Sequence, residues 1–328
     1  MSEVDNLPGS PGHPGTYEVW FLTLTDRDSG RGYWIRSTLG TTARSVPLGG
    51  VWFARFDRGD PSRNLGIHRQ FPVARVAGDA FDVQIGDCSM RSGRAAGSLE
   101  GGGHTLRWEL EYPTGRPTYP LLPEPFYRGG LAPTKPFAPN PATRFSGTVA
   151  VDGETHDVRE APGQQGHLWG SRHAERWAWA QCGDFVDDDT VVHALTAKGR
   201  RGPFTTPYLT SVGVHRDGRW IRLFKLSAKP AFGLGTWKLD VQSRSHRLTG
   251  RIEAPATDLI RARYEDPDGR ARYCHNSEVA SSRLALFERR AGGFEEVALL
   301  ESRGNTHAEW AGLTPASVVE REFVEVAT

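Results

Sequence analysis

The chain has 328 residues, of which 38 are glycine and 22 are proline, so a helix-breaking residue recurs about every five or six positions. This frequency excludes long helical bundles and coiled coils. Lysine and arginine total 40 against 39 aspartates and glutamates, and the resulting net charge of +1 removes the chain-wide attraction expected of a protein that binds nucleic acid or anionic membranes.

The N-terminal sequence, MSEVDNLPGSPGHPG, has neither a basic nor an apolar segment, and no stretch of the chain approaches about 18 uncharged apolar residues. We therefore expect no membrane span, no nucleic-acid partner, a disordered segment over residues 1–14 and a cytoplasmic location. Cys88, Cys182 and Cys274 are far apart and in no CxxC spacing. This pattern fits a reducing compartment and predicts no thiolate metal site. The sequence leaves the oligomeric state open.

Apolar and polar residues alternate along most of the chain, as they do in strands with one buried face. The alternation is faultless in Arg107–Tyr112 and Thr236–Val241. Less regular runs recur roughly every ten to fifteen residues, with turn sequences such as Arg216-Asp217-Gly218 between them. These runs cover residues 17–25, 33–39, 51–56, 81–85, 145–151, 177–182, 190–196, 209–215, 220–226, 248–253, 284–289 and 296–300. The pattern predicts an all-β meander with at most a turn or two of helix.

The stretch from residue 113 to residue 141 differs from the rest, because it holds nine prolines and almost no alternation. It also carries the aromatic residues Tyr119, Phe126, Tyr127 and Phe137. An irregular loop of this length in a compact chain is typically functional or disordered, and its rings favour a lid or wall packed onto the protein. A plain crossover between domains is the alternative.

Strands before this loop and strands after residue 175 form two similar sets. We therefore predict a domain boundary near residue 170. The N-terminal β-domain then covers residues 15–170 and includes the proline-rich loop 113–141, and the C-terminal β-domain covers residues 171–328.

The most informative motif lies at this boundary. Residues 163–182 read GQQGHLWGSRHAERWAWAQC, which places His167 and Trp169 in a glycine-rich loop. Trp177 and Trp179 follow at strand spacing and share one face of the next strand. His173 has no third ligand nearby, so it is a poor metal candidate, and we predict no metal site.

Together with Gly32–Leu39 and Tyr273–Val279, this motif resembles the superfamily of hydroxyneurosporene synthase (carotenoid 1,2-hydratase), tocopherol cyclase and AttH-like proteins over most of the chain. The resemblance implies two antiparallel lipocalin-like β-barrels or sandwiches packed side by side. It also implies an apolar isoprenoid or polyene ligand, rearranged, hydrated or cyclised without a redox cofactor.

Protonating a C=C bond needs a proton donor in a dry pocket, and the cation that forms needs aromatic faces around it. The resemblance also implies a proton-donating carboxylate on the strand after the Trp-x-Trp pair. Here that strand, Thr190–Thr196, has His193 as its only titratable side chain. We therefore take His167 and His193 as candidate catalytic residues. The candidate substrate-binding residues are Trp34, Tyr127, Trp169, Trp177, Trp179 and Gln181.

Three functions remain open at this point. The first is a cofactor-free lyase or isomerase of the hydratase or cyclase type, which acts on an apolar isoprenoid or polyene. The second is a lipocalin-like carrier without chemistry, and the third is a pericyclase of polyketide biosynthesis that works by shape. Each residue also has a plainer interpretation: His167 as a buried histidine bonded to its own loop, and Trp177 and Trp179 as core. Acid catalysis by His167 requires a carboxylate within hydrogen-bond reach and a cavity that the ring lines.

Overall fold

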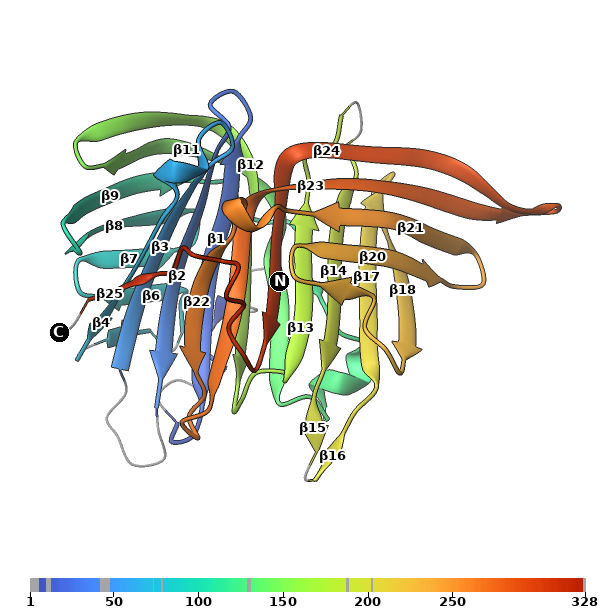
Figure 1. The fold of residues 1–328 in the computed structure, drawn as a ribbon, viewed down its shortest axis with the longest axis horizontal. Helices are drawn as coiled ribbons and strands as arrows, with labels where there is room; N and C mark the ends of the chain where they lie inside the picture. The colour runs from blue at the N-terminus through green and yellow to red at the C-terminus, as the bar shows by residue number, and fades with distance from the viewer. Residues whose placement is uncertain are drawn as a thin grey trace.

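The computed structural model describes residues 6–9, 13–41, 48–72, 74–77, 79–128, 131–186, 189–201 and 203–326. Within these residues the regular structure is β-strand, apart from the short 3₁₀ turns η2 (Pro61–Arg63), η3 (Glu124–Tyr127) and η4 (Ala256–Asp258). The strands form two large sheets that lie side by side (Figure 1). The all-β prediction is confirmed. No helix among the described residues has the length and apolar character needed to cross a bilayer.

The first sheet has 13 strands and comes almost entirely from the N-terminal half of the chain. Its neighbours pair antiparallel, except that β25 pairs in parallel with β4. Its spatial order is β25 (Val324–Val326), β4 (Leu65–Phe71), β3 (Leu48–Asp57), β2 (Arg31–Gly40), β1 (Tyr17–Asp26), β12 (Glu154–Gly170), β11 (Thr134–Val151), β9 (His104–Glu111), β8 (Arg94–Gly101), β7 (Cys88–Arg91), β6 (Asp82–Ile85) and β5 (Ala74–Val76), with β10 (Tyr119–Pro120) beside β11.

The second sheet has 10 strands, and the β15 (Arg200–Arg201) and β16 (Phe204–Thr205) hairpin stands apart from it. Lys225 of β18 (Arg219–Ser227) donates a hydrogen bond of 2.9 Å to the carbonyl of Asp240 in β20 (Thr236–Gln242). These two strands lie near opposite ends of the sheet order, so the sheet curves back on itself. The spatial order is β18 (Arg219–Ser227), β17 (Tyr208–Arg216), β14 (Val191–Lys198), β13 (Arg176–Cys182), β24 (Gly293–Gly312), β23 (Ala271–Arg290), β21 (His246–Glu253), β20 (Thr236–Gln242) and β19 (Phe232–Gly233), with β22 (Ile260–Glu265) beside β23.

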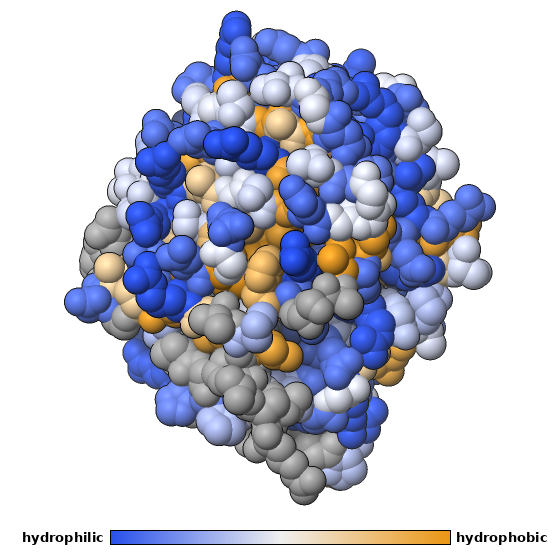
Figure 2. Space-filling model, turned by 90° about the vertical axis from the view of Figure 1, so that its left-hand side faces the viewer, coloured by the Kyte–Doolittle hydropathy of each residue, from blue (hydrophilic) through white to orange (hydrophobic). Residues whose placement is uncertain are grey.

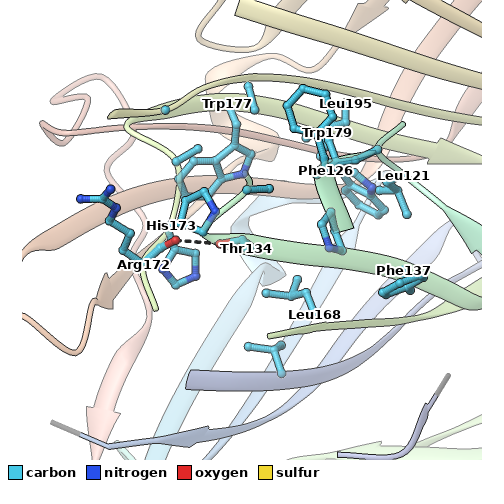
Figure 3. A pocket seen from close by; sticks show the side chains of 18 of the residues that line it. Leu121, Phe126, Thr134, Phe137, Leu168, Arg172, His173, Trp177, Trp179 and Leu195 are labelled. Carbon is cyan, nitrogen blue, oxygen red and sulfur yellow. Dashed lines mark hydrogen bonds between the residues drawn. The ribbon is translucent and has the colours of Figure 1, made fainter. Parts of the chain in front are cut away.

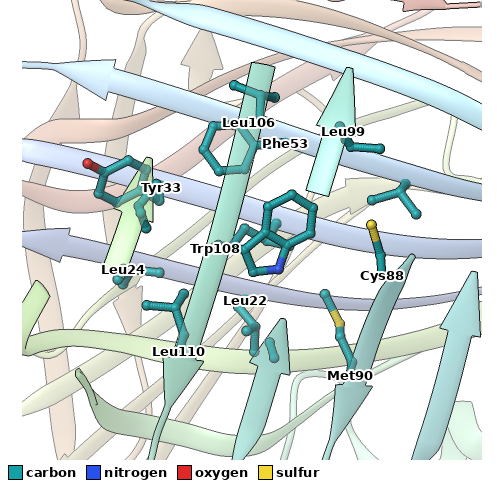
Figure 4. Close-up of a cluster of buried hydrophobic side chains, with 14 of the residues drawn as sticks. Leu22, Leu24, Tyr33, Phe53, Cys88, Met90, Leu99, Leu106, Trp108 and Leu110 are labelled. Carbon is teal, nitrogen blue, oxygen red and sulfur yellow. The ribbon is translucent and has the colours of Figure 1, made fainter. Parts of the chain in front are cut away.

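Each sheet curves around its own apolar core. In the first sheet, Trp108 packs among Phe53, Leu22 and Met90 (Figure 4). In the second, Trp237 is fully buried among aliphatic side chains. On the face shown in Figure 2, hydrophilic side chains cover most of the surface and surround a central band of apolar ones.

A third buried cluster joins the two sheets. Trp34 and Trp52 contribute to it from β2 and β3, and Trp177, Trp179 and Tyr264 contribute from β13 and β22. Alternate residues on β2 and β13 therefore face a neighbouring sheet instead of water, because the side-chain period of a strand is two. This aromatic interface holds the cavity described below.

The structure differs from the sequence analysis in four places. The glycine-rich segment with His167 is the second half of strand β12, and the end of the predicted loop 113–141 is the start of β11. The last strand, β25, joins the first sheet although residues 171–328 were assigned to the second domain. Within the segment predicted to be disordered, Asn6 is buried and its carbonyl accepts a bond from Trp20 Nε1. Residues 1–5 and 10–12 lie outside the described residues.

The sheet changes between β12 and β13, which is where the sequence placed the domain boundary. The separate folding of the two halves stays a prediction.

Candidate functional site

A cavity of about 420 Å³ lies between the two sheets. This volume falls in the range of pockets that take small organic ligands. Figure 3 shows how Trp177 and Trp179 face Leu168 and Phe137 across the space. The first sheet contributes β1, β2 and β12, and the second contributes β13, β14, β17, β22 and β24. Residues from 121–126 and 131–137 provide a further wall. This cavity therefore lies between the two sheets.

Three neighbouring strands of the second sheet turn the same face toward this cavity. Trp177 and Trp179 alternate along β13 with Ala178 and Ala180, which belong to the core of the second sheet. In the pairing register, Trp179 lies opposite Leu195 of β14 and Glu309 of β24. The aromatic face of β13 is thus bordered by Leu195 on one side and by the carboxyl group of Glu309 on the other.

Glu309 is the carboxyl group of the cavity. The indole Nε1 of Trp177 donates to Glu309 Oε1 at 2.6 Å, and Cys274 Sγ lies 3.3 Å from Oε2. Desolvation raises the pKa of Glu309, and the bond from Trp177 offsets part of that rise. A carboxyl group with a raised pKa in an apolar pocket is suited to act as a general acid near neutral pH.

His173 lines the same cavity next to Trp177, with ring centroids 5.8 Å apart. Its Nδ1 lies 2.7 Å from Asp266 Oδ1, and Arg272 forms an ion pair with the other oxygen of Asp266 at 3.1 Å. Burial lowers the pKa of His173 most strongly, while Asp266 acts to raise it. Asp266 accepts from Nδ1, so the neutral ring carries its lone pair on Nε2, for which the described residues provide no hydrogen-bond partner.

Arg36 of β2 lines the cavity from the first sheet and is 7% exposed. Its guanidinium lies 4.2 Å from the ring centre of Tyr264 and 5.6 Å from those of Trp34 and Trp52. The structure gives it no ion pair with a carboxylate of the described residues, and its Nε is buried without a hydrogen bond. The hydroxyl of Tyr264 is buried by the side chains of Asn276 and Cys274.

The proline-rich segment forms a wall of the cavity, as the sequence analysis expected of a functional loop. Tyr127 holds this wall together, because its hydroxyl donates to the Pro136 carbonyl at 2.5 Å and accepts from the Leu122 amide at 3.1 Å. Tyr127 does not line the cavity. Its ring packs on the ring of Phe137, which does line the cavity. Tyr127 therefore positions cavity-lining residues.

His167 and Trp169 lie on the opposite face of β12 from the cavity. His167 pairs in register with Trp20 and stacks on it at 5.1 Å, inside the first sheet, whereas Leu168 points into the cavity. His167 Nε2 lies 2.8 Å from Glu18 Oε1, and both side chains are fully buried. The carboxylate that acid catalysis by His167 requires is therefore present as Glu18. The His167 ring, however, lies in the interior of the first sheet and does not line the cavity.

The glycines around His167 accommodate the protein's own atoms and not a ligand. A Cβ on Gly166 would lie 2.2 Å from the ring of Phe21, and one on Gly163 would lie 2.0 Å from the Thr23 carbonyl. The space beside these glycines is therefore filled by neighbouring strands.

His193 and Gln181 share the strand face of Trp179 but lie beyond the end of the cavity. The Nε2 atoms of both side chains bond to the Pro141 carbonyl, at 2.8 Å for His193 and 3.2 Å for Gln181. Burial lowers the pKa of His193 to about 4. These two residues join the sheets by hydrogen bonds, and neither lines the cavity.

Of the candidate residues from the sequence, the cavity therefore brings together Trp34, Trp177 and Trp179. It leaves out His167, His193, Trp169, Gln181 and Tyr127. Their roles in function are not tested by this placement alone and stay predictions. The sequence analysis did not consider Glu309, Asp266 or Arg36 as site residues. The sequence around Glu309 does contain a signal. Ala308 and Trp310 alternate with Glu309, so in a strand these two residues face one side and Glu309 faces the other.

Metal ligation was tested on the same residues. No group of three or more histidine, cysteine, aspartate and glutamate side chains is placed to hold an ion within the described parts of the chain.

Two curved antiparallel sheets packed side by side around an apolar cavity define a two-barrel protein of the lipocalin-like type. The solved kievitone hydratase of Nectria haematococca shares this fold, with a TM-score of 0.52 over 96% of this chain and 92% of that one at 11% identity. The chain belongs to the tocopherol cyclase-like family, whose model matches residues 141–312, more than half of its length.

Two relatives agree with this assignment. An uncharacterized protein of Mycobacterium tuberculosis is 27% identical over 285 residues, 85% of this chain and 84% of that protein. A probable chloroplastic tocopherol cyclase of Oryza sativa is 25% identical over 180 residues, 52% of this chain. The matched part is 37% of the rice protein's length. The predicted superfamily and its lipocalin-like fold are thus confirmed.

Proposed function

We propose that this protein is a proton-transferring enzyme of the cyclase or hydratase type, which acts on an isoprenoid or polyene bound between its two sheets. The observation that carries the proposal is the Glu309 carboxyl group, which lines an apolar cavity and receives a hydrogen bond of 2.6 Å from Trp177. Membership of the tocopherol cyclase-like family supports the class of reaction.

The chemistry begins at Glu309, whose raised pKa favours the protonated form. Glu309 transfers its proton to one carbon of a C=C bond, and a carbocation forms on the other carbon. The carboxylate left behind is stabilised by the Trp177 N–H. The faces of Trp179 and the other cavity rings surround the cation without offering a nucleophile.

The cation is then consumed by an oxygen or alkene of the same molecule, or by water, and a proton is released. His173 Nε2 accepts that proton, while Asp266 holds the ring through Nδ1. One proton leaves Glu309 and one arrives at His173, so the substrate gains none in a cyclisation and one water in a hydration. Exchange with solvent restores both groups.

Deuterium labelling tests this proposal. The protein is incubated in D₂O with geranylgeraniol, geranylgeranic acid or 2-geranylhydroquinone, and in parallel any ligand extracted from the purified protein is identified by mass spectrometry. Wild-type protein is expected to place carbon-bound deuterium in at least one of these compounds. Glu309→Gln, which keeps an oxygen for Trp177, is expected to place none. Glu301→Gln on the same strand is the control, because Glu301 pairs with Arg283 outside the cavity.

The alternatives give different results in this experiment. Ring formation without deuterium would support a pericyclase. Recovery of every compound unchanged and unlabelled from wild-type protein would contradict proton transfer and support a carrier.

A further inference from the structure

Arg36 is a cation buried between the sheets, and the carboxyl group of Glu309 in the same cavity acts on it only from beyond ion-pair distance. Arg36 is 7% exposed, lines the cavity, and forms no ion pair with the described residues, whereas the buried Arg272 is paired with Asp266. An unpaired guanidinium inside a protein is strongly unfavourable, because it has lost its hydration without gaining a counter-charge. Contact with three rings recovers part of this cost but satisfies none of the N–H donors.

The guanidinium of Arg36 also has unused hydrogen-bonding capacity. Its Nε is buried without a hydrogen bond to the described residues. The ring of Tyr264 lies under the guanidinium, but the Tyr264 hydroxyl lies by the side chains of Asn276 and Cys274. Native proteins rarely leave a buried guanidinium unpaired, so Arg36 at the wall of a cavity points to a missing ligand atom. The N–H donors of a guanidinium match a carboxylate, which accepts several hydrogen bonds.

We propose that Arg36 binds a carboxylate on the substrate through its guanidinium, so that the substrate is an isoprenoid or polyene acid. This inference rests on the proposed function for the identity of the apolar part of the substrate. The carboxylate is a binding group and takes no part in the proton transfer. The rest of the cavity wall is apolar or aromatic and takes the chain.

The test compares cis-parinaric acid, a fluorescent polyene acid, with its methyl ester, which has the same chain but no charge. Wild-type protein is expected to bind the acid about 10-fold or more tightly than the ester, since a charge-assisted pair in a dry site is worth at least one such factor. Arg36→Gln is expected to bring the two affinities within about twofold, chiefly by weakening the acid.

Arg55→Gln is the matched control. Arg55 lies on the neighbouring strand β3 and bonds to the Arg63 carbonyl at 2.7 Å outside the cavity. This variant loses the same charge from the same sheet and is expected to keep the preference for the acid. Equal binding of acid and ester by wild-type protein, or loss of the preference in Arg55→Gln but not in Arg36→Gln, would overturn the proposal.

Thermal unfolding of the ligand-free protein separates binding from a structural role. If Arg36 serves a ligand, Arg36→Gln is expected to unfold at the same temperature as wild type or higher, because a buried unpaired charge has been removed. A lower unfolding temperature together with an unchanged preference for the acid would mean that Arg36 only joins the rings, and would refute the proposal.

The two proposals fail separately. Glu309→Gln is expected to keep the preference for the acid while losing deuterium incorporation. A preference for the acid in a wild-type protein that labels no compound would leave the carboxylate site standing and remove the enzyme.

Discussion

Trp177 Nε1 donates a hydrogen bond of 2.6 Å to Glu309 Oε1 between two residues that are 132 positions apart in the sequence. The pair forms because β13 and β24 are neighbours in the second sheet and turn the same face to the cavity. Trp177 is therefore expected to have two roles. Its ring would stabilise the carbocation, and its N–H lowers the pKa of Glu309, the group that would form the carbocation by protonation.

Replacing Trp177 by phenylalanine is expected to raise the pKa of Glu309. The bond from Trp177 lowers this pKa, and its loss leaves desolvation less opposed. A general acid works below its pKa, so the decline of activity at high pH should move upward by about one pH unit, the equivalent of one hydrogen bond. The measurement is kcat/KM as a function of pH, on a compound that wild-type protein labels in D₂O.

Trp179→Phe is the control for this shift. Trp179 lines the same cavity but forms no hydrogen bond with Glu309. A pH profile that moves equally in both variants would show that lost ring volume, and not the hydrogen bond, controls Glu309.

Asp266→Asn is expected to slow turnover about 100-fold, within the range ascribed to general acid–base groups. Asp266 is a positioning residue that raises the pKa of His173. His173 accepts a proton only in its neutral form, so the rise of activity on the low-pH side should move to lower pH in this variant. Unfolding should also be easier by roughly 3–5 kcal/mol, because buried Arg272 loses its partner.

Asp26→Asn provides a matched control for Asp266. Asp26 Oδ2 lies 2.8 Å from His156 Nε2 in a histidine–aspartate pair outside the cavity. This variant is expected to lose stability by about 1–2 kcal/mol and to keep the wild-type turnover and pH profile. A loss of turnover in both variants that follows stability alone would remove His173 from the mechanism.

The sequence predicts the fold better than it predicts the site. Alternation in Thr236–Val241 and the runs like it requires strands, and the Trp-x-Trp pair at 177 and 179 does line the cavity. His167 was assigned to a loop because β12 is rich in glycine, whereas the structure places it on a strand. In a strand, neighbouring side chains point to opposite faces, and it is Leu168 that faces the cavity.

Glu309, Asp266 and Arg36 were missed for a different reason. Each reaches the cavity through pairing between distant strands or through contact of the two sheets, and local patterns do not encode such contacts. The expected carboxylate was sought on β14, the next strand along the chain. It comes instead from β24, which lies on the other side of β13.

His193→Gln is expected to reduce the acid sensitivity of the protein. Burial lowers the pKa of His193 in the folded protein to about 4, against the ordinary histidine value of 6.5, so the unfolded chain binds a proton first as the pH falls. Stability from this residue is present above pH 6.5 and is lost as the pH falls toward 4. Between about pH 7 and pH 5 the loss amounts to about 2 kcal/mol.

Glutamine retains an N–H donor for the Pro141 carbonyl but does not titrate. Urea unfolding at the two pH values should therefore show wild-type protein losing about 2 kcal/mol more than His193→Gln. The same loss in both proteins would place the sensitivity in other buried groups.

Gly166→Ala is expected to narrow the cavity. A Cβ on Gly166 would lie 2.2 Å from the ring of Phe21, which lines the cavity and meets Trp179 edge to face at 5.9 Å. The ring must move toward the ligand space, because the strand pairing of β1 and β12 fixes the backbone on the other side. Overpacking of this kind costs about 1–3 kcal/mol, so affinity for cis-parinaric acid should fall about 10-fold or more.

Gly40→Ala is the control, since its added Cβ has no atom within 4 Å. Unchanged affinity in Gly166→Ala, with Gly40→Ala as reference, would mean that the ligand does not occupy the space beside Phe21.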